Sequence, residues 1–182
     1  TKSVAATSIT GKVIATNGTV TLTSTSDALS IDGQVKGKGQ VALTADKAIS
    51  VGGTLTSTSA NVKVAAGTSY TQTGDVTAET DVTTSSGGAT EISGDVTSRG
   101  TVNLTSLDDL GVTGLVTGEG QVKLTATKAI SVGGTLTSNT ANVNVDAGTS
   151  YTQTGDILAA TNVDTKSVAA TSITGKVIAT NG

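Results

Sequence analysis

The chain has 182 residues, a formal net charge of −3 and 35% hydrophobic residues, and its only aromatic residues are two tyrosines. It contains no His and no Cys, which removes the usual general base, the usual thiol nucleophile, the commonest zinc ligand and any disulfide framework. The eleven basic residues are scattered, and no apolar stretch approaches about 18 residues, so neither nucleic-acid binding nor a membrane span is predicted.

The two ends of the chain have identical sequences. Residues 1–18 and 165–182 both read TKSVAATSITGKVIATNG, so Thr165 matches Thr1 and the sequence has a 164-residue tandem period. We therefore expect residues 1–182 to be one continuous segment, one period plus an 18-residue overlap, cut from a longer array of the same repeat.

A shorter period lies inside the long one, because a glycine recurs every 20 to 22 residues. In chain order, each unit has an aliphatic residue two positions after the glycine, then an aliphatic pair spaced by two, then usually a second such pair. The glycines are at positions 11, 33, 53, 74, 94, 114, 134, 155 and 175; the first unit continues with Val13, Val20/Leu22 and Leu29/Ile31, and the next with Val35, Val41/Leu43 and Ile49/Val51.

A spacing of two is the periodicity of a strand whose alternate side chains face opposite sides. Three short strands in about 20 residues cannot bury a face alone, but they can form one coil of a stack. The sequence therefore predicts an all-β fold, a parallel β-solenoid of about eight to nine coils with three short strands per coil. The lack of proline agrees, since proline would remove a ladder hydrogen bond.

The long period consists of two similar halves of four coils, which test this assignment. The units that begin at Gly33 and Gly114 differ only between the positions assigned to the interior, and one difference reverses a charge, Lys38 to Glu119. Such a change is tolerable on a solvated face and prohibitive in a dry core.

Acidic residues are the only remaining catalytic or metal-binding candidates. Asp108 and Asp109 are adjacent in a turn, but the matching turns hold other residues, so we expect a solvated turn. Asp75, Asp95 and Asp156 share the position after the unit glycine without continuing into a calcium-binding repeat, so a mixed-charge surface is expected. No cofactor, metal site or enzymatic activity is predicted.

Threonines share one outward position in five consecutive units and form the clearest candidate surface. A column of this kind fits either plain strand propensity or a flat ligand-binding face, for ice or a polysaccharide. Its members are Thr56, Thr77, Thr97, Thr117 and Thr137.

Tyr70 and Tyr151 occupy matching places in two SYTQT segments. Their register directs them inward as core residues; the alternative is an exposed ring every four coils, suited to contact with a sugar or a neighbouring filament. Asn17 and Asn103 match the N-glycosylation sequon and are possible modification sites.

The segments GTLTSTSANVKVAAGTSYTQT and GQVKGKGQVALTADKAISVG resemble repeats of the filamentous haemagglutinin family of large bacterial exoproteins and adhesins. The resemblance implies a right-handed parallel β-helix shaft that is exported and displayed at the cell surface.

We therefore expect a structural repeat segment of an extracellular filament or adhesin stalk, which provides length and stiffness. Its expected partners are further copies of the same repeat, joined end to end covalently or non-covalently, and surface glycans. The alternative is a ligand-binding solenoid that presents an outward Thr/Asn face to a polysaccharide or to ice.

Overall fold

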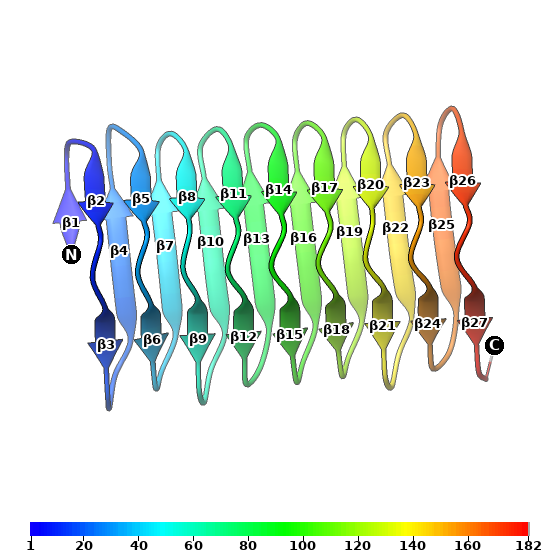
Figure 1. The fold of residues 1–182 in the computed structure, drawn as a ribbon, viewed down its shortest axis with the longest axis horizontal. Coiled ribbons are helices and arrows are strands. Elements are labelled where there is room, and N and C mark those ends of the chain that lie inside the picture. The colour runs from blue at the N-terminus through cyan, green and yellow to red at the C-terminus, as the bar shows by residue number, and fades with distance from the viewer. Residues whose placement is uncertain (182) are drawn as a thin grey trace.

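The computed structural model describes residues 1–181, and in them the chain forms 27 strands and no helix. Gly182, the last residue of the predicted segment, lies outside the described residues. The strands form three sheets of nine strands each, and every pairing is parallel between one coil and the next. The predicted parallel β-solenoid with three strands per coil is confirmed (Figure 1). We number the coils so that coil one contains β1 to β3 and coil nine contains β25 to β27.

Sheet A contains the longest strands. Its members are β1 (Lys2–Ser3), β4 (Val20–Ser24), β7 (Val41–Ala45), β10 (Val62–Ala66), β13 (Val82–Ser86), β16 (Val102–Ser106), β19 (Val122–Ala126), β22 (Val143–Ala147) and β25 (Val163–Ser167). From β4 to β22 the first, third and fifth residues of each strand are buried, so alternation places three side chains per coil in the core.

Sheet B follows sheet A in each coil and consists of short strands. Its members are β2 (Thr7–Ile9), β5 (Leu29–Ile31), β8 (Ile49–Val51), β11 (Tyr70–Gln72), β14 (Thr90–Ile92), β17 (Leu110–Val112), β20 (Ile130–Val132), β23 (Tyr151–Gln153) and β26 (Thr171–Ile173). The first and third residues face inward in coils two to eight, and the middle residue faces out.

Sheet C completes each coil. Its members are β3 (Val13–Ala15), β6 (Val35–Gly37), β9 (Leu55–Ser57), β12 (Val76–Ala78), β15 (Val96–Ser98), β18 (Val116–Gly118), β21 (Leu136–Ser138), β24 (Ile157–Ala159) and β27 (Val177–Ala179). The residue two positions after each unit glycine begins these strands, and from Val35 to Ile157 it is buried, as the sequence predicts.

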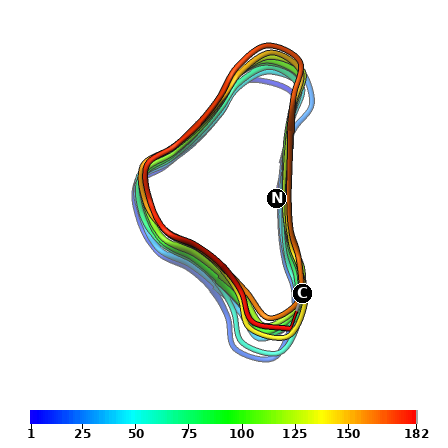
Figure 2. The ribbon, with the colours of Figure 1, turned by 90° about the vertical axis from the view of Figure 1, so that its right-hand side faces the viewer.

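The coils have a roughly triangular outline and nearly superimpose when viewed along the axis (Figure 2). Sheet A forms the straight side, and sheets B and C form the two sides that meet at a bend. As the chain advances from left to right, the long strands run upward on the far side and the short ones downward on the near side, so the solenoid is right-handed (Figures 1 and 2). Connections between parallel strands of one sheet strongly prefer this hand.

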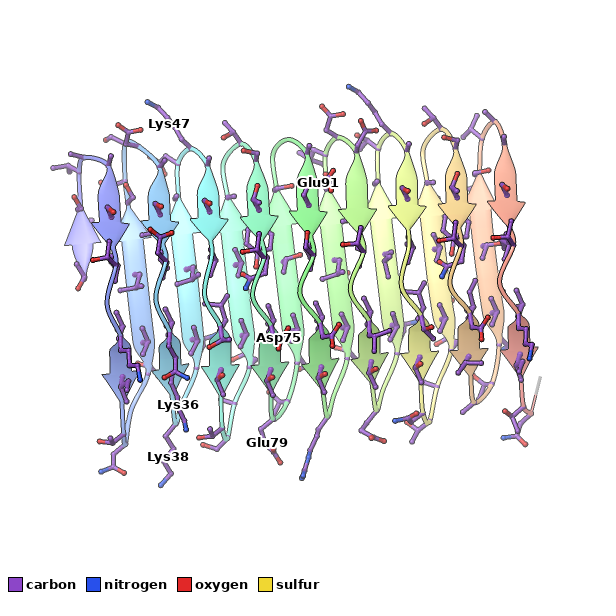
Figure 3. The ribbon with its side chains drawn as sticks, in the orientation of Figure 1. Lys36, Lys38, Lys47, Asp75, Glu79 and Glu91 are labelled. Carbon is purple, nitrogen blue, oxygen red and sulfur yellow. The ribbon has the colours of Figure 1, made fainter. Side chains whose placement is uncertain are left out.

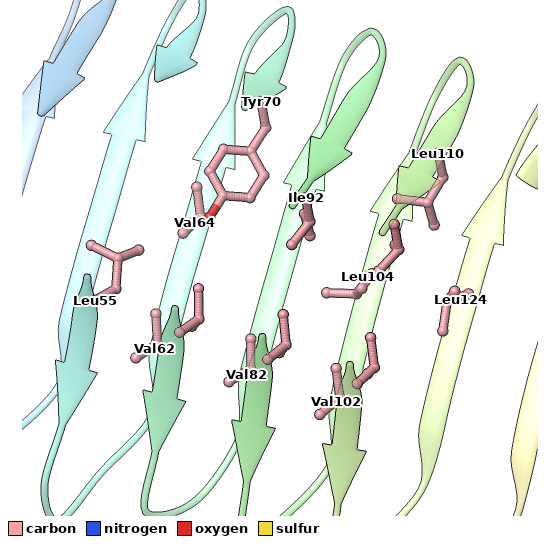
Figure 4. Packing of buried hydrophobic residues seen from close by; sticks show 14 of the residues in the cluster. Leu55, Val62, Val64, Tyr70, Val82, Ile92, Val102, Leu104, Leu110 and Leu124 are labelled. Atoms are coloured by element: carbon pink, nitrogen blue, oxygen red, sulfur yellow. The ribbon is translucent and has the colours of Figure 1, made fainter. Parts of the chain in front are cut away.

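The core is one aliphatic column that runs the length of the stack. Val62, Leu104 and Leu124 have no exposed surface, and their side chains point into the space between the sheets (Figure 4). At the two ends the same positions are partly exposed, and Val177 in coil nine retains 49% of its surface. A single coil cannot cover its own apolar residues, so burial depends on a neighbour on each side.

The last inward position of the sheet A and sheet C strands holds a small residue, Ala, Ser or Gly, close to a turn. Several of these serines bind a backbone carbonyl: Ser57 donates to Gly39 O at 2.8 Å, Ser106 to Gly88 O at 2.8 Å and Ser138 to Gly120 O at 2.8 Å. Small side chains therefore fit the narrow corners and satisfy carbonyls that the strands leave unpaired there.

The recurrent glycine stands at the bend between sheets B and C, where backbone lies directly on backbone. A Cβ atom added to Gly53 would lie 2.0 Å from the carbonyl oxygen of Gly33, and one added to Gly94 would lie 2.2 Å from that of Gly74. Gly11, in coil one, has nothing within 4 Å of that position. The glycine period thus reflects close stacking of successive coils at this corner.

Candidate functional surfaces

The five threonines of the predicted column are in register on sheet C and face outward. Thr56 pairs with Thr77, Thr77 with Thr97, Thr97 with Thr117, and Thr117 with Thr137. Thr77 and Thr97 are exposed, and the other three are half-buried. The adjacent outward column, at the corner before each strand, is mixed: Thr54, Asp75, Asp95, Leu115 and Thr135. The hydroxyl column is therefore one residue wide.

Apolar side chains replace threonine at both ends of this column. Ile14 and Ile178, which hold the same place in the repeat, are 53% and 46% exposed, and Leu158 lies next to Ile178 in register. Each end has a shallow, open depression, of about 420 Å³ beside Ile14 and about 400 Å³ beside Ile178. Lys36 and Lys38 extend from the first of them into solvent (Figure 3).

Tyr70 and Tyr151 are core residues. They retain 0% and 1% of their surface, and the ring of Tyr70 points from β11 into the space between the sheets (Figure 4). Each hydroxyl donates to the Oε1 atom of the glutamine two residues on, at 2.8 Å for Gln72 and 2.7 Å for Gln153. Burial raises the pKa of both phenols. Core filling is confirmed, and the alternative of exposed rings that contact a sugar or filament is wrong, because neither ring reaches the surface.

The coil after each tyrosine has a more polar interior, a feature that the search for aliphatic pairs missed. Tyr70 pairs with Thr90 in register, and Tyr151 pairs with Thr171. Thr90 Oγ1 lies 2.7 Å from Ser86 Oγ, and both residues are buried. A small residue thus follows the large ring along the same column, which conserves core volume. Aliphatic residues are missing at positions 84 and 90, and this was the available signal.

The aspartates after the unit glycine act as caps between coils. Oδ1 of Asp75 accepts from the backbone N–H of Asp95 at 3.0 Å, Oδ1 of Asp95 from Leu115 at 2.8 Å, and Oδ1 of Asp156 from Lys176 at 2.8 Å. In each pair the donor is 20 residues ahead, in the next coil. These carboxylates satisfy amides at the bend where the strand ladder is interrupted.

Asp108 and Asp109 diverge to different partners. Asp108 Oδ1 is 2.7 Å from Lys128 Nζ, and the hydrogen bond from this ammonium lowers the pKa of Asp108, while the same contact raises that of Lys128. Asp109 Oδ1 accepts from the backbone N–H of Ala129 at 3.0 Å. Both therefore join coil six to coil seven, and the geometry assigns no acid–base pair to them.

Ion pairs repeat this pattern along the outer surface. Each joins residues 20 apart, in neighbouring coils, and lies on an outer face or turn, as the positions of Lys47 and Glu79 show in Figure 3. The four pairs are Lys47–Asp27, Arg99–Glu79, Lys128–Asp108 and Lys166–Asp146. All lie between partly exposed side chains, so each contributes little to stability on its own.

The two sequon asparagines differ in setting. Asn17 lies in an exposed turn after β3. Asn103 is half-buried on the outer face of β16, and Thr105 Oγ1 lies 3.5 Å from its Oδ1 atom. Asn17 is thus the more accessible of the two candidate glycosylation sites.

Across residues 1–181, no three His, Cys, Asp or Glu side chains gather into a metal-binding group. The same residues contain no helix of the length and hydropathy needed to cross a membrane. Comparison with protein-family models, curated proteins and solved structures gives no match to this chain. The likeness to filamentous haemagglutinin repeats therefore stays a hypothesis.

Proposed function

We propose that this chain is a structural segment of an extracellular filament or adhesin stalk, and that extension along its axis is its function. The observation that supports this most directly is the continuity of the three nine-stranded parallel ladders from end to end. Core, hydrogen bonds and ion pairs all connect one coil to the next, and the two chain ends lie at opposite ends of the stack (Figure 1).

The turns support the same proposal. Each coil takes 20 to 22 residues, so long loops of the kind that enclose a substrate are missing between residues 1 and 181. The depressions on the surface are shallow and open. A repeat of this design gains length by adding coils, with no change to those already present.

Export to the cell surface is part of the proposal, with other copies of the repeat and surface glycans as partners. It rests on the Gly- and Thr-rich, Cys-free composition and on the resemblance to bacterial exoprotein repeats. An antibody raised against the chain should label intact cells of the source organism. Label that appears only after the cells are permeabilised would contradict the surface location.

The length of the particle tests the structural role. The 182-residue chain and a chain extended by one further 164-residue period should both scatter X-rays as straight rods. The longer rod should exceed the shorter by about 38 Å, since eight coils advance about 4.8 Å each. Rods of equal length and greater thickness would show that the repeats pack side by side, and would overturn the proposal.

The threonine column favours a second candidate function, binding of ice or of a polysaccharide along sheet C. Thermal hysteresis of the freezing point tests ice binding, and co-sedimentation with insoluble glycans tests the other. Thr97→Lys should abolish either activity, and Thr83→Lys, on the outer face of sheet A, serves as the matched control. Activity that survives Thr97→Lys would exclude this column as the site.

A further inference from the structure

The identical sequences 1–18 and 165–182 occupy the two end coils, and each end coil is bonded on a different face. Coil one is bonded only to coil two, and coil nine, as far as Asn181, is bonded only to coil eight. The outer face of each leaves three strand edges open. The structure thus contains one and the same sequence in both halves of a junction.

Coil one uses one set of backbone atoms for its bonds to coil two. Thr7 N donates to Ala28 O at 3.0 Å and Val13 N to Gln34 O at 2.8 Å. Ile9 O accepts from Asp32 N at 2.9 Å, and Ala15 O accepts from Lys38 N at 3.0 Å.

Coil nine uses a different set for its bonds to coil eight. Ala170 O accepts from Tyr151 N at 2.8 Å, and Lys176 O from Ile157 N at 2.8 Å; Thr174 N donates to Gln153 O and Thr180 N to Ala159 O. In the first copy of the sequence these atoms correspond to Ala6 O, Lys12 O, Thr10 N and Thr16 N, none of which appears in the other set. One copy of the repeated segment can therefore bond on both faces at once.

We propose that two copies of this chain join end to end by coil exchange: coil nine of one copy displaces coil one of the other and pairs with its coil two. Every contact of the new junction already exists within a single chain, because Thr171, Ile173 and Val177 take the places of Thr7, Ile9 and Val13. The partner is therefore a second copy of this chain, and the surface is continuous with an interface already present.

Exchange preserves the number of interfaces while it orders fewer residues. Nine coils share eight interfaces; after exchange each chain keeps eight coils, with seven interfaces inside the chain and one to its partner. The displaced segment regains conformational entropy, which opposes the entropy lost on association. Reuse of a native element between identical chains is a recurrent route to assembly.

Direct stacking of coil nine on an intact coil one is the competing arrangement, and charge disfavours it. It would place Lys166 beside Lys2 and Lys176 beside Lys12 along the same columns. Like charges directly opposite each other in a sheet are destabilising. Exchange avoids both pairs, because Thr23 and Gln34 then stand opposite these lysines, as they stand opposite Lys2 and Lys12 within one chain.

The chain has no cysteine, so pairs of introduced cysteines report the arrangement in the otherwise intact 182-residue protein. Ser8 and Ser30 are register partners on the outer face of sheet B, and Ser172 is the counterpart of Ser8 in coil nine. Within one chain Ser30 and Ser172 lie seven coils apart, about 34 Å at about 4.8 Å per coil. Mild oxidation of S30C/S172C should therefore give a ladder of disulfide-linked chains on a non-reducing gel, growing with protein concentration.

Two further pairs control the geometry. S8C/S30C should close within one chain, since adjacent strands place Cα atoms within disulfide range. S8C/S172C reports direct stacking and should give no ladder. A monomeric S30C/S172C alongside a closed S8C/S30C, or a ladder from S8C/S172C alone, would overturn coil exchange.

Two substitutions in identical local sequence provide a second test. Ile9→Asp weakens the coil that must leave and should strengthen the S30C/S172C ladder, whereas Ile173→Asp weakens the coil that must enter and should abolish it. Equal effects of the two would contradict the mechanism. The inference rests on the proposed structural role, yet the outcomes separate: rods that lengthen by one period without a ladder would refute exchange and leave that role intact.

Discussion

The hydroxyl of Tyr70 donates to Oε1 of Gln72 at 2.8 Å inside the solenoid, and Nε2 of Gln72 donates in turn to the carbonyl oxygens of Gly53 and Gly74, at 3.0 and 2.6 Å. Tyr151 and Gln153 repeat this network four coils later. A buried polar network with all of its members bonded favours one arrangement of its neighbours over others. These pairs therefore mark the register of the stack at every fourth coil.

The buried phenols predict a loss of stability in alkali. Burial raises the pKa of Tyr70 and Tyr151, so their contribution to the free energy of unfolding is complete below the ordinary tyrosine value of about 10 and is lost as pH rises toward the higher folded values. Urea unfolding monitored by circular dichroism should show stability that declines above pH 10. The double variant Tyr70→Phe/Tyr151→Phe should decline less steeply. Phenols that ionise near pH 10 in a fully folded chain would contradict their burial.

The glycine corner predicts a position-dependent effect of one methyl group. Gly94→Ala forces a Cβ atom against Gly74 O and should lower the free energy of unfolding by about 2–3 kcal/mol, the upper part of the range for overpacking. Gly11→Ala changes the same column in coil one, where nothing lies within 4 Å, and should have little effect. Urea denaturation of the two variants measures the difference, and equal losses would show that stacking does not select this glycine.

Adjacent residues on one strand should differ sharply in tolerance of charge. Leu104→Lys places an ammonium in the dry core and should cost more than about 3 kcal/mol, enough to prevent folding of a marginal domain. Thr105→Lys, one residue on, faces outward in the column that holds Lys166 in coil nine, and should shift stability by about 0.5 kcal/mol or less. Thermal unfolding tests both, and a stable Leu104→Lys variant would contradict the inward assignment.

The Asp108–Lys128 contact predicts a measurable titration. Lys128→Gln removes the ammonium that lowers the pKa of Asp108, so the carboxyl should titrate closer to an ordinary aspartate. The contact stabilises the fold above the unfolded aspartate pKa, and this contribution fades as pH falls through the lower folded value. NMR titration of the Asp108 carboxyl carbon tests the shift, and an unchanged value in the variant would show that another group causes it.

The sequence predicted the fold to the level of individual core residues, because alternation and the glycine period both follow from backbone geometry. Val41, Val62 and Val122, assigned inward from spacing alone, have no exposed surface.

The polar contacts were harder to foresee. The Asp75 cap on the next coil and the Ser57 hydroxyl at the corner depend on side-chain directions at turns, where the period of two ends. The threonine column was predictable in position, but its narrow, mixed surroundings depend on how the corner residues are exposed.

Consecutive coils are held together along the axis, and the chain ends lie at its two extremities, which determines how the molecule responds to being pulled (Figure 1). A load between the termini acts first on the outermost coil, and each coil that detaches releases about 20 residues, or about 70 Å of extended chain, in place of about 4.8 Å of rod. The segment should therefore lengthen in steps, like a shock absorber that peels turn by turn, before the remaining stack breaks.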